Sequence, residues 1–70
     1  MIKLTNGDWV NPECVVAIQQ GQIERTRVFI ILDANSNLRY EFPSEEEAKN
    51  FRDENALLIS GVETTVTRVD

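Results

Sequence analysis

The sequence predicts an α+β fold that is mostly β: an antiparallel meander of about five strands, one helix at about residues 45–56 and a C-terminal strand. Several short segments alternate apolar and polar residues, which is the pattern of half-buried strands. The stretch TRVFIILD at residues 26–33 contains five consecutive large apolar residues and predicts a central strand. The stretch SEEE at residues 44–47 is typical of a helix start.

The N-terminal segment predicts a β-hairpin. Apolar and polar residues alternate over residues 2–5, and the dipeptide Asn6-Gly7 that follows favours a tight hairpin turn. We therefore expect Trp9 and Val10 to begin the returning strand.

The next segment interrupts the β pattern and then resumes it. Asparagine caps helical turns and proline fixes φ, so Asn11-Pro12 predicts a single helical turn or a β-turn. Residues 15–18 are rich in β-branched side chains and predict a strand. The polar residues 19–22 include a glycine and are expected to be a connection.

Residues 26–32 and 38–42 predict two paired strands, joined by a hairpin loop at residues 33–37. The length of this loop determines which side chains share a face of the sheet. A three-residue loop at Asn35 to Asn37 gives one arrangement, and a loop of two or four residues gives the other. The sequence leaves this register open.

A capping box predicts the helix, because the Ser44 hydroxyl can accept the amide of Glu47. The spacing of Ala48, Phe51 and Leu58 predicts the buried face of this helix. Beyond Gly61, residues 62–69 are rich in valine and threonine and predict the closing strand.

Both faces of the central strand are apolar, and one short helix can cover only one face of a sheet. Two or three exposed bulky side chains would forgo roughly 1.5 to 3 kcal/mol each, which is large for a chain of 70 residues. We therefore expect a homodimer or higher oligomer. The expected interface residues are Phe29, Ile31, Tyr40 and Trp9. The alternative is a monomer whose sheet coils into a closed barrel.

Composition predicts one small domain, residues 1–70, in the cytoplasm. The single cysteine fits a reducing compartment, and neither an export leader nor a membrane span is signalled. Twelve acidic and seven basic residues give a net charge of −5, which repels phosphate backbones. Nucleic acid is therefore not expected as a partner, and the lack of a spanning run argues against a membrane.

The residue types present argue against catalysis. The chain has no histidine, so the common general base is absent and Cys14 lacks the partner that would lower its pKa. Free cysteine is usually a core residue. The glutamates at residues 45–47 suit the positive end of a helix dipole. We expect no enzyme, metal site or cofactor.

A few residues are candidates for binding an anionic small molecule: Arg25, Arg27, Arg39, Trp9 and Asn11. The arginines could hold a phosphate or carboxylate, or they could pair with acidic residues on neighbouring strands. Trp9 could be a binding platform or a lid over the sheet edge, and the sequence favours the lid.

Residues 1–52 combine MIKLT at the start, Asn11-Pro12 before a β-run, the VFIIL strand, an asparagine-rich turn, Tyr40 two residues after Leu38 and the Ser44-Glu-Glu-Glu helix start. In these features they resemble the small FlbD-type proteins of bacterial flagellar operons and similarly built short phage or prophage proteins. The acidic balance and residues 62–69 depart from that pattern. The resemblance implies a small β-rich accessory protein without catalytic activity.

Two functional hypotheses follow. The first is a non-enzymatic protein-interaction module that engages itself or a host protein through its apolar sheet face; the resemblance to phage proteins implies a phage-encoded module of this kind. The second is an oligomer that sequesters an anionic small molecule or nucleotide with arginines at its subunit interfaces.

Overall fold

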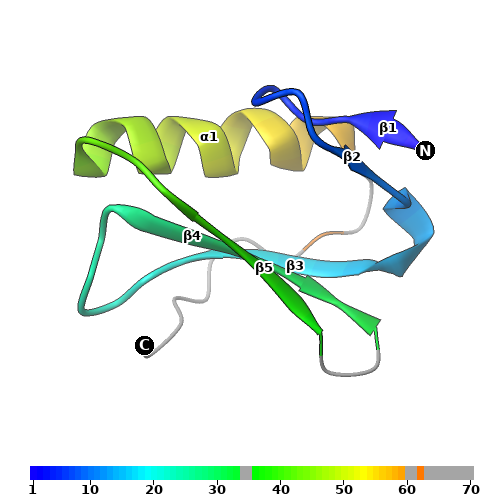
Figure 1. Cartoon of the computed structure of the whole chain (residues 1–70), viewed down its shortest axis with the longest axis horizontal. Coiled ribbons are helices and arrows are strands. Elements are labelled where there is room, and N and C mark those ends of the chain that lie inside the picture. Colours follow the sequence, from blue (N-terminus) through cyan, green and yellow to red (C-terminus); the bar gives the residue numbers. More distant parts are fainter. Residues whose placement is uncertain (34–35, 60–61, 63–70) are drawn as a thin grey trace.

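Five strands in two antiparallel sheets are followed by one helix, so the predicted α+β class is confirmed (Figure 1). The structure, a computed structural model, describes residues 1–33, 36–59 and 62. The elements are β1 (Ile2–Lys3), β2 (Trp9–Val10), the 3-10 turn η1 (Pro12–Cys14), β3 (Val15–Gln20), β4 (Arg27–Leu32), β5 (Asn37–Glu41) and α1 (Glu45–Leu58). The predicted closing strand at residues 62–69 lies, apart from Val62, outside the described residues. No helix in the described part of the chain is long and apolar enough to cross a membrane.

The predicted single meander is instead two sheets, β1-β2 and β3-β4-β5. The break falls at η1, where the Asn11 side chain accepts a hydrogen bond from the Glu13 amide at 3.0 Å. Pro12 fixes φ and has no amide hydrogen, so β2 cannot continue as a paired strand. The predicted helical turn is confirmed, and it separates the N-terminal hairpin from the larger sheet.

The N-terminal hairpin closes through a three-residue loop, Thr5 to Gly7. Leu4 donates its amide to Asp8 at 2.7 Å and accepts the Gly7 amide at 2.9 Å. Gly7 has a φ of 97°, a conformation that glycine adopts without strain. The predicted hairpin is therefore confirmed, with glycine at the position that requires a positive φ.

The register of the larger sheet decides which side chains of β4 and β5 share a face, a question that the sequence left open. Ile30 lies opposite Leu38, and Val28 lies opposite Tyr40. The side chains of Leu38 and Tyr40 consequently share a face with Val28 and Ile30. Leu32 also donates to Ser36 at 2.8 Å, so the pairing continues one position beyond Ile31 and Asn37. Asn37 therefore belongs to β5, and the loop predicted at Asn35 to Asn37 was placed too late in the chain.

Helix α1 begins as the capping box predicts, because the Ser44 hydroxyl accepts the Glu47 amide at 3.2 Å. It ends two residues beyond the predicted residue 56, at Leu58. The predicted buried face is correct for Ala48 and Phe51 but wrong for Leu58, which is half exposed. Ile59, in extended conformation at the C-cap, reaches the core instead.

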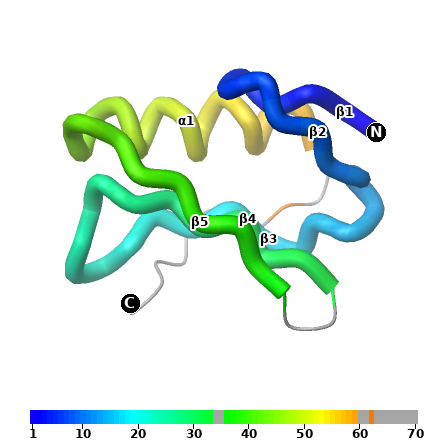
Figure 2. The backbone as a smooth tube through the Cα atoms, in the orientation of Figure 1, coloured from blue at the N-terminus to red at the C-terminus, as the bar shows by residue number. Residues whose placement is uncertain are grey.

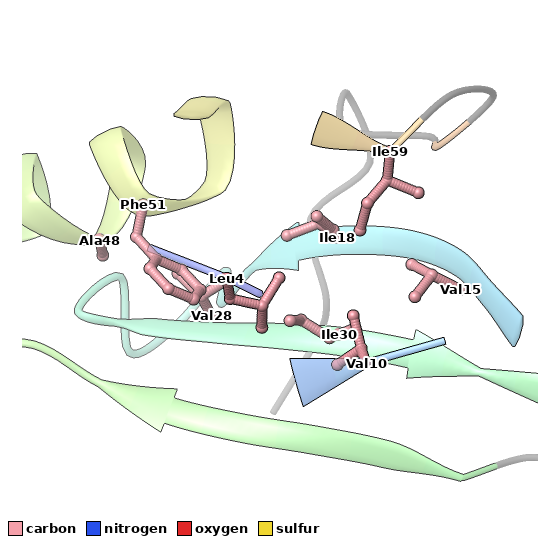
Figure 3. Packing of buried hydrophobic residues seen from close by; sticks show 9 residues of the cluster. All are labelled: Leu4, Val10, Val15, Ile18, Val28, Ile30, Ala48, Phe51 and Ile59. Carbon is pink, nitrogen blue, oxygen red and sulfur yellow. The ribbon is translucent and has the colours of Figure 1, made fainter. Parts of the chain in front are cut away.

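The hydrophobic core lies between the helix and one face of the larger sheet, and the hairpin closes it at one end (Figures 1 and 3). Helix α1 contacts β3 and β4. From β5, Tyr40 and Phe42 pack on Phe51, with ring centroids 5.5 Å and 4.9 Å apart. The buried cluster comprises Leu4, Val10, Val15, Ile18, Val28, Ile30, Ala48, Phe51 and Ile59.

Strand β3 departs from the predicted boundaries and contains an irregularity. The pairing with β4 shifts between Val15 and Ala17, which leaves Val16 exposed. Gln19 and Gln20, predicted to lie in a connection, belong to this strand.

The N-terminal hairpin lies beside the C-terminal end of α1 (Figure 2). The buried amide of Asn55 joins the helix to this hairpin. Its Oδ1 accepts the Thr5 amide at 2.9 Å, and its Nδ2 donates to the Thr5 hydroxyl at 2.9 Å and to the Phe51 carbonyl at 2.7 Å. Asn55 is 0% exposed. A buried amide with all these partners fixes the position of the hairpin on the helix.

Replacing Asn55 by alanine is expected to lower the free energy of unfolding by about 1 to 3 kcal/mol, because polar groups of Thr5 and Phe51 lose their partner. Urea denaturation followed by circular dichroism measures this change. Asn50→Ala is the matched control, since Asn50 lies exposed on the same helix, and it should change stability by less than about 0.5 kcal/mol. Equal effects of the two substitutions would show that the Asn55 hydrogen bonds do not stabilise the fold.

Candidate functional site

The N-terminal hairpin presents Trp9 to solvent. Trp9 lies opposite Lys3 in the β1-β2 pair, and both side chains are exposed, whereas Val10 and Ile2 turn towards the core. Trp9 as a whole is 60% exposed. The prediction that Trp9 is a lid over the sheet edge is therefore wrong, because the aliphatic side chains of the hairpin cover the core in its place.

Two groups of side-chain hydrogen bonds hold the loop that precedes Trp9. On one side Thr5 bonds to Asn55 of the helix. On the other side the Tyr40 hydroxyl donates to Asp8 Oδ2 at 2.8 Å. The hairpin thus spans from the helix to β5, and these bonds fix the loop on the N-terminal side of the indole.

The hydroxyl of Tyr40 is held in its neutral form. Burial raises the pKa of Tyr40 to about 12, and the hydrogen bond to the Asp8 carboxylate and the negative charge of that group act in the same direction. A tyrosine in this state serves as a hydrogen-bond donor. It is a structural tie between β5 and the hairpin.

An open depression of about 400 Å³ lies beside the hairpin loop. Phe42 and Phe51 give it an apolar part, and Glu47 and Glu54 add two carboxylates from the helix. Its lining is completed by Thr5, Asn6 and Asn50. This combination of aromatic rings, amides and carboxylates suits a basic side chain rather than an anion.

The predicted arginines do not form one anion site in this chain. Arg25, before β4, forms an ion pair with Glu45 at the start of the helix. Arg27 pairs with Glu41 across the β4-β5 ladder, with Nε and Oε1 2.9 Å apart. Arg39 is exposed and forms no ion pair with a described residue. Asn11, also a predicted ligand, instead caps η1.

The predicted interface residues lie on different surfaces. Phe29 lies opposite Arg39 and Ile31 lies opposite Asn37, so both point away from the helix. Tyr40 lies on the opposite face of the sheet and packs on the helix. Phe29 is only 5% exposed and Ile31 is half-buried, so the burial of the Phe29 ring does not require a second subunit.

The described residues offer little reactive chemistry. Cys14 is half-buried at the end of η1 and is a free thiol, so its expected place in the core is not observed. Asp53 is paired with Arg52 and Lys49, and these charges hold the pKa of its carboxyl below the usual value despite some burial. Within residues 1–33, 36–59 and 62, no group of three or more cysteine or carboxylate side chains could hold a metal ion.

Sequence analysis missed the residues that position the site. Asn55 and Asp8 are polar residues without a motif, and their partners lie 50 and 32 positions away along the chain. Gln20 was also missed; it is buried, donates to the Arg25 carbonyl at 2.7 Å and accepts from Arg52 at 3.4 Å. The only available signal was the helical spacing of Asn55 from Phe51, which places it on the buried face.

No family model, curated protein or solved structure matches this chain. Its function must therefore be inferred from its own residues and their geometry.

The pKa of Tyr40 can be measured directly, because Tyr40 is the only tyrosine in the chain. The folded group titrates near 12 and the unfolded group near 10, so the unfolded state loses its proton first as the pH rises. The raised pKa of Tyr40 therefore affects the free energy of unfolding. The stability that protonated Tyr40 contributes is complete below pH 10 and is lost as the pH rises from 10 to 12. Phenolate absorbance should show a midpoint near 12 in the folded protein.

In the Asp8→Asn variant the pKa of Tyr40 should be lower than in the native protein, because the carboxylate of residue 8 is lost. It should stay above 10, because the burial of Tyr40 remains. The urea-unfolded chain provides the reference. A native midpoint near 10, with circular dichroism unchanged, would contradict the tie between Tyr40 and Asp8.

Proposed function

We propose that this chain is a non-catalytic protein-interaction module whose contact surface is centred on Trp9. The supporting observation is the 60% exposure of Trp9 on a hairpin fixed by hydrogen bonds to the helix and to β5. Leaving a large aromatic side chain in water forgoes burial energy. Exposed tryptophans that are held rigidly are frequent centres of protein interfaces.

The rigidity of the hairpin favours binding by Trp9. Thr5 is tied to the helix and Asp8 is tied to β5, so the backbone on the N-terminal side of the indole is ordered before any partner arrives. Val10 anchors the other side in the core. A preorganised contact loses less conformational entropy on association than a mobile loop.

The charge of the chain favours a partner with basic residues. The net charge is −5, and the depression beside the hairpin contains Glu47 and Glu54 next to two phenylalanine rings. Asn6 of the hairpin loop also lines this depression. A lysine or arginine of the partner would find both apolar and acidic contacts there.

Sequestration of an anionic small molecule has less support. Arg25 and Arg27 are paired with Glu45 and Glu41, and these carboxylates would compete with an incoming anion. Acidic side chains that could serve in catalysis also have structural partners, such as Glu47 at the helix cap. Binding of a protein partner fits these contacts better than sequestration of an anion or catalysis does.

Site-specific photo-crosslinking in the native host tests this proposal. A photoreactive amino acid at position 9 should capture one defined protein species, which mass spectrometry identifies. The same group at position 46, an exposed residue of α1, is the control and should not capture that species. Absence of any protein adduct from position 9 would overturn the proposal.

The Trp9→Ala variant should weaken association of the identified partner with the purified chain by about tenfold or more, which is typical of an interface centre. Its free energy of unfolding should change by less than about 0.5 kcal/mol, because the indole is mostly in solvent. Isothermal titration calorimetry and urea denaturation provide the two values. A large loss of stability would instead make Trp9 a structural residue.

A further inference from the structure

The outer edge of β5 is open among the described residues. The sheet order is β3-β4-β5, so β5 is hydrogen bonded to a described strand on one side only. Phe42 donates to Thr26, and Leu32 donates to Ser36, which places the even-numbered residues of β5 in hydrogen-bonded pairs with β4. Backbone groups alternate in direction along an antiparallel strand, so those of the odd-numbered residues point outwards.

These outward-pointing residues carry opposite charges. Arg39 and Glu41 are both exposed, and their side chains lie on the sheet face away from the helix. Glu41 bonds to Arg27, yet its side chain remains 60% exposed. Charges on an edge strand usually oppose pairing with another chain. Opposite charges two residues apart can instead favour pairing of two copies, because in one antiparallel register each positive side chain lies opposite a negative one.

Only certain registers allow two β5 edges to pair. Hydrogen bonds require outward-pointing residues to face each other, so the two-fold axis must pass at a residue position. An axis at Arg39 places two arginines opposite each other, and an axis at Glu41 does the same for two glutamates; both arrangements are unfavourable. An axis at Leu38 places Arg39 opposite the neutral Asn37. An axis at Tyr40 places Arg39 of each copy opposite Glu41 of the other.

We propose that two copies of this chain pair antiparallel through their β5 edges, with the two-fold axis at Tyr40. The two three-stranded sheets then form one six-stranded sheet, and both helices cover the same face. This dimer goes beyond the function proposed for Trp9, because it uses a different surface, the edge of β5, and names a second copy of the chain as the partner there.

The contacts of this dimer follow from the positions of the charged residues. The backbone N–H and C=O groups of Arg39 and Glu41 bond to those of Glu41 and Arg39 in the other copy. Glu41, already 2.9 Å from Arg27, then lies between two guanidinium groups in a row across the sheet. The next outward-pointing residue is Pro43, which has no amide hydrogen and ends the pairing.

Sedimentation equilibrium of the native chain should give twice the monomer mass of 8.0 kDa, with a weaker dimer at high salt. Arg39→Glu and Glu41→Arg should each weaken the dimer by about tenfold or more, because each replaces two attractive pairs by repulsive ones. An equimolar mixture of these two variants should associate again, since every cross-strand pair then has opposite charges.

The Glu46→Arg variant is the matched control, because it makes the same charge change as Glu41→Arg at an exposed helix position. It should leave the dimer unchanged. Hydrogen exchange on the native chain supplies a test that needs no variant: the amides of Arg39 and Glu41 should become protected as concentration rises.

A native chain that stays monomeric at high micromolar concentration would overturn the dimer, as would variants that dimerise normally or a mixture that fails to associate. Unprotected amides at Arg39 and Glu41 in a dimeric sample would place the interface elsewhere and also overturn the proposal. These outcomes leave the test at Trp9 unaffected, because crosslinking there reports any protein partner. Failure of the dimer is therefore distinguishable from failure of the interaction function.

Discussion

The buried amide of Asn55 is the interaction on which the N-terminal part of the structure depends. Strands β1 and β2 contain two residues each, and a hairpin of that size is not stable by itself. The Asn55 side chain holds Thr5 of this hairpin against the helix, which places Leu4 and Val10 over the core. Trp9 faces solvent as a result of this placement, so the exposed contact surface follows from a buried hydrogen-bond network.

Strand β5 serves both the core and the surface. On its inner side, Tyr40 packs on Phe51 and bonds to Asp8, which ties the sheet to the helix and the hairpin. On its outer face, Arg39 and Glu41 lie in solvent with opposite charges. Tyr40 also marks the proposed dimer axis. A dimer at this edge would extend the sheet beyond β5, and the core already holds β5 in place.

Features that depend on neighbouring residues were predictable from the sequence. The Asn6-Gly7 turn, the Asn11 cap and the Ser44 cap use backbone groups within three residues. The candidate site was less predictable, because alternation alone does not say whether Trp9 or Val10 faces the core. The pairing of Arg25 with Glu45 was also missed, since it joins a loop to a helix 20 residues away.

The sequence by itself determined the class of fold, the turns at Asn6-Gly7 and Asn11-Pro12, the helix start and the absence of histidine chemistry. These follow from local backbone preferences and from which residue types are present. Only the tertiary structure decided the split into two sheets, the β4-β5 register, the burial of Asn55 and the open edge of β5. Each of these depends on which distant segments meet, and the free energy of such contacts is not encoded in any single stretch of residues.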